Sequence, residues 1–192
     1  MKIAAALFGA CLLLTACEDT PEKPPESHYP SPVESIPRSP AADPAAVRWM
    51  DGFCAAVRGY QERTNREAAP TRPTPSSVAE VQRAISEELG GLADRTGETI
   101  RKLTALPAAP VPLGETVRRA FITKFTTARD RAAGAKTALD RAKPGNEASQ
   151  GPAFQALDQA QLDLDGTYDP VGAVTASPEL MLAAAGAPGC KS

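Results

Sequence analysis

The sequence predicts an all-α domain, an antiparallel four-helix bundle with a short fifth helix at the C-terminal end. Three observations support this fold class. Apolar residues recur at spacings of three and four along several segments, which is the period of an amphipathic helix. Aromatic residues make up only 5% of the chain, and the Val-, Ile-, Thr- and Tyr-rich runs typical of strands are missing. Clusters of Pro and Gly divide the helical segments and leave short connections, which favour antiparallel neighbours.

The first predicted helix begins at Pro44 and ends near Ala69. Asp43 is a favourable N-cap residue, and proline is favoured at the first helical position. Three prolines at positions 70, 73 and 75 stop the helix. Its apolar side carries Val47, Trp49, Met50, Phe53, Cys54, Val57 and Tyr60.

The second predicted helix begins at Ser77 and ends near Leu106. Its first residues, Ser-Val-Ala-Glu, have the form of a capping box, in which two backbone N–H groups are satisfied reciprocally. Gly90 and Gly91 interrupt the apolar stripe, and each glycine costs about 1 kcal/mol relative to alanine in a helix interior. The pair therefore predicts a bend or a close helix contact, with a functional hinge as the alternative.

The third predicted helix follows the break between Pro107 and Pro112 and ends before Lys143. Its apolar residues alternate at spacings of four and three, which is a heptad pattern. These residues are Phe121, Phe125, Ala128, Ala132, Ala135, Leu139 and Ala142. The pattern predicts a helix packed nearly parallel to the axes of its neighbours, and the alanines permit close approach.

Two further helices complete the predicted bundle. The fourth opens at Gly151-Pro152, and its apolar side carries Phe154, Leu157, Leu164 and Tyr168. The fifth opens at Ser177-Pro178-Glu179, where an N-cap residue precedes proline, and it ends before Gly186. We expect this short helix to lie across the bundle and the tail after it to present Cys190.

Residues 1–16 have the organisation of a signal peptide. Lys2 precedes an apolar run of 12 residues, whereas a membrane-spanning helix needs roughly 20. The sequence Leu14-Thr15-Ala16-Cys17 resembles the lipobox of bacterial lipoproteins, in which a cysteine thiol receives a diacylglyceryl group. The resemblance implies cleavage before Cys17 and acylation, palmitate included, that holds the protein outside the cytoplasm at the cell membrane. A secreted protein with an incidental cysteine is the alternative.

Residues 17–43 are predicted to be a lipidated, disordered stalk. Seven prolines lie between Glu18 and Asp43, among charged residues and with almost no apolar clusters, and such a segment cannot bury a core. Extended polyproline rises about 3.1 Å per residue, which would hold the domain up to roughly 80 Å from the lipid. The predicted organisation is therefore a signal peptide at 1–16, a stalk at 17–43 and a helical domain at 44–192.

The cysteines predict one disulfide. Of the four in the chain, Cys11 lies in the signal peptide and Cys17 would be acylated, which leaves Cys54 and Cys190. An exported domain lives where disulfides persist, so this pair is expected to be bonded. The alternative is a buried free Cys54 with an intermolecular bridge through Cys190. The Phe-Cys pair and the cysteine after a Ser-Pro-Glu-Leu helix also resemble small Ala-rich helical exported proteins of high-GC Gram-positive bacteria, which implies the same disulfide and localisation.

Composition and motifs argue against several function classes. The net charge of −2 does not favour nucleic-acid binding. The one histidine, His28, lies in the stalk, so neither hydrolase triads nor histidine-based metal sites are predicted. The chain also has no glycine-rich nucleotide motif. We therefore expect no catalytic residue, metal or cofactor, and interpret the domain as a non-catalytic module that binds a partner or ligand. The alternatives are an envelope enzyme using carboxylates or a lysine and a structural spacer.

Charge is unevenly distributed between the third helix and the segment after it. The helix is basic, whereas no Lys or Arg occurs between Pro144 and Gly189. In one interpretation the acidic segment partners the basic helix. In the other, Arg118, Arg129 and Lys136, which fall within about 20° of one another on a helical wheel, contact an anionic envelope polymer or lipid head groups. The expected partners are thus the membrane, through lipid on Cys17, and an envelope protein or anionic polymer.

Overall fold

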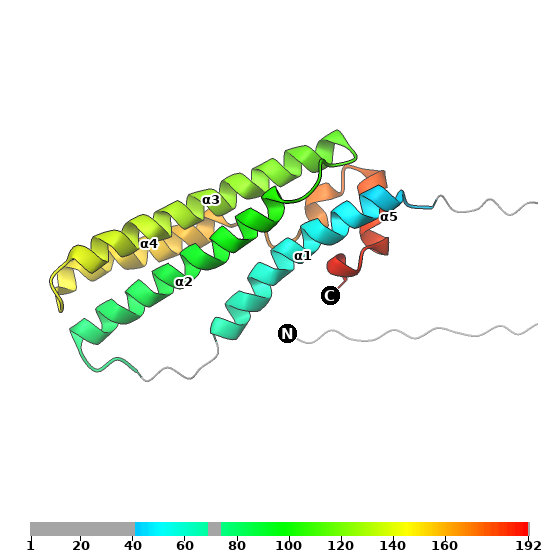
Figure 1. The fold of residues 1–192 in the computed structure, drawn as a ribbon. Helices are drawn as coiled ribbons and strands as arrows, with labels where there is room; N and C mark the ends of the chain where they lie inside the picture. The colour runs from blue at the N-terminus through cyan, green and yellow to red at the C-terminus, as the bar shows by residue number, and fades with distance from the viewer. Residues whose placement is uncertain (1–40, 69–73, 192) are drawn as a thin grey trace, which may run out of the picture. The chain divides into compact units, whose positions relative to one another are not determined.

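A computed structural model describes residues 41–68 and 74–191. Its helices are α1 (Pro44–Glu67), α2 (Val78–Thr104), α3 (Pro112–Arg141), α4 (Gln150–Asp163) and α5 (Pro178–Gly186), with short 3₁₀ helices η1 (Glu147–Ser149), η2 (Gly172–Val174) and η3 (Pro188–Cys190). The described residues form no strand, and the predicted all-α bundle with a short fifth helix is confirmed (Figure 1). The signal peptide, Cys17, His28 and nearly all of the predicted stalk lie outside the described residues.

Side-chain caps confirm three of the predicted helix starts. The Asp43 carboxylate accepts a backbone N–H of the first turn of α1 at 3.0 Å. The hydroxyls of Ser77 and Ser177 each accept the N–H three residues further on, at 3.3 and 3.2 Å. The capping box of α2 closes one residue earlier than predicted, because the Glu80 carboxylate accepts the N–H of Ser76 at 2.7 Å.

The helices α2 and α3 form the antiparallel centre of the bundle (Figure 1). α1 packs along the C-terminal half of α2, and α4 runs antiparallel to the C-terminal half of α3. α5 and η3 pack against α1. Each end of the α2–α3 pair is therefore covered by a different helix. The Gln61 side-chain amide of α1 donates to the carbonyl of Tyr168, in the segment after α4, at 2.8 Å.

The core under α1 is built from aromatic rings. The Trp49 and Phe53 rings stack with centroids 5.1 Å apart, and Phe53 packs on Phe121 of α3 at 5.0 Å. One turn along, the rings of Tyr60 and Phe125 meet edge to face at 5.3 Å. All five side chains are buried, so the apolar stripe predicted for the first helix is the centre of this core.

The core under α4 is built from small residues instead. Ala128, Ala132 and Leu139 of α3 are buried as the heptad predicts, and α4, which packs against α3, buries Ala153 and Ala160. The prediction that the apolar side of the fourth helix includes the Phe154 and Tyr168 positions is wrong, since both side chains are exposed. Alanines bring the two helices close together, and Phe154, one residue round the helix from Ala153, is left outside.

Gly90 and Gly91 lie within α2, which runs through them without a break. A Cβ atom on Gly90 would lie 3.2 Å from Lys136 Cε, and one on Gly91 would lie 3.0 Å from Arg95 Nη1. Each glycine therefore makes room for a long basic side chain that crosses the helix surface. Gly90 thus lies under the end of a lysine side chain from α3, and Gly91 faces Arg95 of its own helix, so the close approach of two helices at this pair stays a prediction.

Candidate functional site

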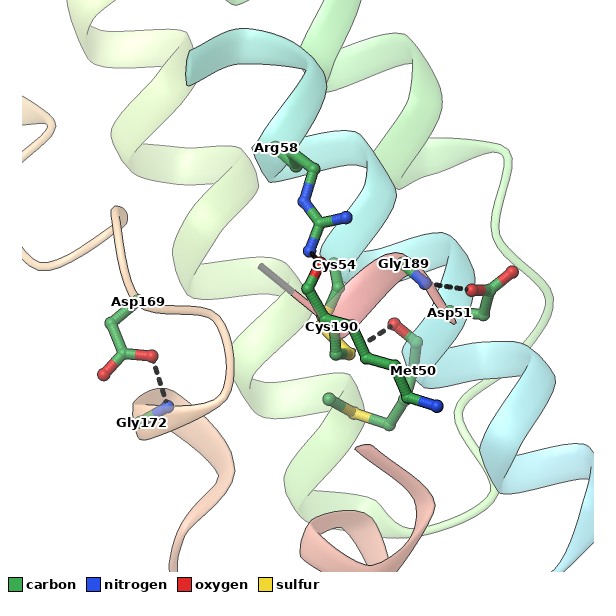
Figure 2. Close-up of a disulfide and its surroundings, with 9 residues drawn as sticks. Met50, Asp51, Cys54, Arg58, Asp169, Gly172, Gly189 and Cys190 are labelled. Carbon is green, nitrogen blue, oxygen red and sulfur yellow. Dashed lines mark hydrogen bonds between the residues drawn. A yellow bond between two sulfur atoms is a disulfide. The ribbon is translucent and has the colours of Figure 1, made fainter. Parts of the chain in front are cut away.

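The predicted disulfide is present and fixes the C-terminal tail to the middle of α1. Cys54 of α1 and Cys190 of η3 are bonded across a sequence separation of 136 residues. Cys54 is fully buried on the same face of α1 as Met50, and Cys190 Sγ lies 3.4 Å from the Met50 carbonyl oxygen (Figure 2). The alternative of a free Cys54 with an intermolecular bridge through Cys190 is therefore wrong for this structure.

Polar contacts on both sides of the disulfide hold the tail as well. The Gly189 N–H donates to the Asp51 carboxylate at 2.5 Å, and the Arg58 guanidinium donates to the Lys191 carbonyl (Figure 2). A side chain on Gly189 would collide with the backbone of Asp51, so this position requires glycine. The tail is thus clamped by one covalent bond between two hydrogen bonds, and we assign this region a structural role.

Of the three residues predicted to contact an anion, Arg118 has a structural role within the domain. Its Nη1 donates to the carbonyls of Leu106 and Pro107, at 2.8 and 3.1 Å, just beyond the end of α2. Its Nη2 pairs with the Glu115 carboxylate at 2.6 Å. These carbonyls belong to the connection between α2 and α3. Arg118 therefore ties this connection to the first turns of α3, and its side chain is mostly buried there.

Lys136 belongs to a polar cluster that bridges α2 and α3. Its ammonium lies 2.5 Å from the Asp140 carboxylate and 3.1 Å from Ser86 Oγ, and the Ser86 hydroxyl donates to Asp140 at 2.5 Å. The hydrogen bond from Lys136, and then that from Ser86, lowers the pKa of Asp140. The cluster therefore links Ser86 of α2 to Lys136 and Asp140 of α3 through an ion pair and two hydrogen bonds. The cluster is thus suited to joining two helices.

The acidic segment partners other cations of α3 than these three. Arg131 Nε lies 2.6 Å from an Asp163 carboxylate oxygen, and the Lys124 ammonium donates to the Asp165 backbone carbonyl. Both contacts lie along the seam between α3 and α4. At this seam the acidic segment does partner cations of the basic helix, as the first interpretation expects. Arg118, Arg129 and Lys136 lie on the side of α3 that faces α2 instead.

Arg129 lines a groove on the surface of α2 that we call the arginine groove. It has a volume of about 520 Å³, and Arg63 of α1, Arg101 of α2 and Arg129 of α3 line it together with Asp94, Gly97 and Ile100. Arg63 is paired with Glu67 and Glu98 at 2.8 and 2.9 Å. Arg129 pairs with its neighbour Asp130 at 2.8 Å, and within the described ranges the Arg101 side chain makes no ion pair or hydrogen bond.

The solvent side of α4 and the segment after it form a second candidate surface, which we call the α4 outer face and which consists of Phe154, Asp158, Leu162, Asp165 and Tyr168. The exposed fractions are 65% for Leu162, 49% for Phe154 and 47% for Tyr168. A hollow of about 440 Å³ lies between Leu162 and Tyr168, with both carboxylates at its edge. Behind it, burial of Tyr60 beside the Tyr168 hydroxyl raises the pKa of Tyr60 to about 12.

Sequence reasoning missed Leu162, Arg63 and Arg101 as surface-site residues. A signal for Leu162 was present, because Ala153, Leu157, Ala160 and Leu164 form their own stripe at spacings of four, three and four. Leu162 and Phe154 fall outside that stripe. The arginine groove had no comparable signal, since its residues come from three helices and meet only through packing.

Comparison with known proteins shows no relationship from which a family could be inferred. No family model, no curated protein and no solved structure matches this chain. Among the described helices, none combines the length and apolarity that crossing a membrane requires. In the same part of the chain, no group of three or more His, Cys, Asp or Glu side chains is placed to hold a metal ion.

Proposed function

We propose that this protein is a lipid-anchored module of the cell envelope that binds a protein partner, without catalysis, through the α4 outer face. The Leu14-Thr15-Ala16-Cys17 pattern supports the anchoring and the extracytoplasmic location. The exposure of three large apolar side chains along one short helix and the turn after it carries the binding part of the proposal.

Clustering is what makes these exposed residues informative. Single apolar residues on a surface are normal, but a contiguous group rimmed by polar residues marks an interaction site. Phe154, Asp158 and Leu162 recur at spacings of four and therefore share one side of α4, and Asp165 and Tyr168 follow in the segment after it. Phe and Tyr rings with a central Leu are suitable anchors for a partner, because they bury large apolar areas on binding.

The charge of the α4 outer face indicates which kind of partner fits. Asp158 and Asp165 flank Leu162, and no Lys or Arg occurs from Pro144 to Gly189. Carboxylates at this position repel anionic lipids and anionic polymers, whereas they attract Lys and Arg side chains. The partner chemistry is therefore a protein segment, most simply an amphipathic helix, with apolar anchors and basic flanks.

Binding can be tested with a synthetic amphipathic Leu-Lys helix and the same peptide with Glu in place of Lys. We expect the full chain, purified in a nonionic detergent, to bind the Lys peptide and not the Glu peptide. Leu162→Ser should weaken binding by about tenfold, because it removes a central apolar anchor. Leu182→Ser is the matched control, since Leu182 is 40% exposed but lies on α5.

Two results would contradict the binding proposal. One is equal affinity for the Lys and Glu peptides. The other is an equal loss of affinity for the Lys peptide in the Leu162→Ser and Leu182→Ser variants. Sedimentation of the unliganded protein is the companion measurement, because self-association abolished by Leu162→Ser would show that a second copy occupies this face.

Anchoring is tested separately by Cys17→Ser in cells that process lipoproteins. Without the thiol no acyl chains can be attached, and we expect the protein to leave the membrane fraction. The Cys11→Ser variant is the control, since that cysteine lies in the predicted signal peptide. Retention of the Cys17 variant in membranes at the wild-type level would show that lipid does not anchor the chain.

A further inference from the structure

We propose that the arginine groove is a binding site for a phosphate group, separate from the α4 outer face and independent of the function proposed for that face. The residues that would bind the ligand are Arg101 and Arg129, with Arg63 at the side of the groove. The ligand class is a phosphate ester or diester, because the groove of about 520 Å³ holds more than a bare anion.

Gly97 places the two principal arginines around one spot. A Cβ atom on Gly97 would lie 3.7 Å from Arg101 Nη1 and 3.8 Å from Arg129 Cδ. The absence of a side chain there leaves an open floor between an arginine of α2 and an arginine of α3. A ligand on this floor is within reach of both side chains.

The internal ion pairs leave these two guanidinium groups able to bind a ligand. The Arg101 guanidinium makes no ion pair or hydrogen bond within the described part of the chain. The partner of Arg129 is the exposed adjacent residue Asp130, and exposed pairs of this kind contribute little. Two cations that flank the same glycine repel each other, and an anion between them removes that repulsion.

The geometry favours phosphate over a carboxylate. A carboxylate presents two oxygens in one plane and suits a single guanidinium fork. A phosphate group presents several oxygens in different directions and can be shared by guanidinium groups that approach from different helices. Asp94 is the one acidic residue in the lining, so removing its charge should strengthen anion binding.

The test is calorimetric titration of the full chain, in a nonionic detergent at low salt, with two probes. Inorganic phosphate represents free phosphate, and glycerophosphoglycerol is the water-soluble head group of phosphatidylglycerol. We expect at least one probe to bind, with affinity that falls as salt is raised. Binding of phosphate alone identifies a free-phosphate site, and stronger binding of the diester identifies a lipid head group or similar polymer unit.

Three variants separate a built site from general attraction. Arg101→Gln should weaken binding by about tenfold, and Asp94→Asn should strengthen it several-fold. Gly97→Leu should abolish binding, because the leucine side chain fills the floor of the groove. Leucine has a high helix propensity, so α2 should stay folded in this variant. Arg119→Gln is the control, since Arg119 is an exposed arginine of α3 outside the groove and should leave the affinity unchanged.

The proposal is overturned if neither probe binds, or if Arg119→Gln weakens binding as much as Arg101→Gln does. It is also overturned if Gly97→Leu keeps the wild-type affinity while circular dichroism shows a folded domain. An amide NMR shift of Gly97 on titration is the direct readout that a non-specific surface effect would not give.

Discussion

The two helices that cover the α2–α3 pair are held in different ways. α1 packs on the aromatic rings of Phe121 and Phe125 of α3 and is tied to the C-terminal tail by the disulfide. α4 packs on alanines, and polar bridges close that end: the Gln82 amide donates to the Leu139 carbonyl at 3.1 Å, and the Gln150 amide donates to the Val78 carbonyl at 2.9 Å. One end is thus stabilised by large buried surfaces, and the other by close backbone approach and hydrogen bonds.

This difference explains why the candidate partner surface lies on α4. A fully buried Phe or Leu contributes about 1.5–3 kcal/mol relative to exposure, whereas alanine has much less surface to bury. α1 therefore uses its large apolar residues for the core. α4 buries alanines through close contact with α3 and leaves Phe154 and Leu162 exposed, at little cost to the fold.

The largest expected effect comes from removing the disulfide at the α1 end. Replacing both Cys54 and Cys190 with serine should lower the free energy of unfolding by up to about 5 kcal/mol, because the bond closes a loop of more than a hundred residues. Urea denaturation measures the loss, and adding a reductant to the wild-type chain should reproduce it. A loss below about 1 kcal/mol would mean that the aromatic core alone holds this end.

A matched pair of phenylalanine substitutions tests the comparison directly. Phe125→Ala should cost about 3–5 kcal/mol, because the ring is fully buried against Tyr60. Phe154→Ala should change stability by less than about 0.5 kcal/mol, because half of its surface is exposed and α4 is held by its alanines. Comparable losses in urea denaturation would show that the two ends are stabilised in the same way.

The same contrast accounts for what could be predicted from the sequence. Strong local signals, such as the caps at Asp43, Ser77 and Ser177, fixed the helix starts, and periodic large residues fixed the core of α1. Around α4 the expectation followed the largest apolar side chains, whereas packing is governed there by the small ones. An alanine contributes to the core only when the neighbouring helix comes close, and that proximity is a tertiary property.

The candidate sites also differ in whether the sequence alone could predict them. Cys54 and Cys190 could be paired from the sequence, because the expected cleavage of the signal peptide and acylation of Cys17 would leave no other pair. Arg118 and Lys136 were placed on one side of a helix, but their partners were not foreseeable from a helical wheel: carbonyls beyond the end of α2 for Arg118, and Ser86 of α2 for Lys136. Arg101 joins Arg129 only because α2 and α3 run antiparallel with Gly97 between them.

The smallest expected effect is a pH dependence at the polar bridge between α2 and α3. Hydrogen bonds from Lys136 and then Ser86 hold the pKa of Asp140 below its ordinary value of 3.8. A carboxyl group with a lowered folded pKa stabilises the fold above that ordinary value and loses this contribution as the pH falls through the folded pKa. Since the pair is partly exposed, the contribution should stay below about 1 kcal/mol. The Asp140→Asn variant should therefore be less stable than the wild type near pH 7, and the stabilities of the two proteins should converge in acid.

The Lys136→Met variant should lose most of this pH dependence of stability, because the substitution removes the cation that lowers the pKa of Asp140. A gap between wild type and Asp140→Asn that persists unchanged to the lowest pH at which both fold would mean that Ser86 and Lys136 do not act through the ionised carboxylate.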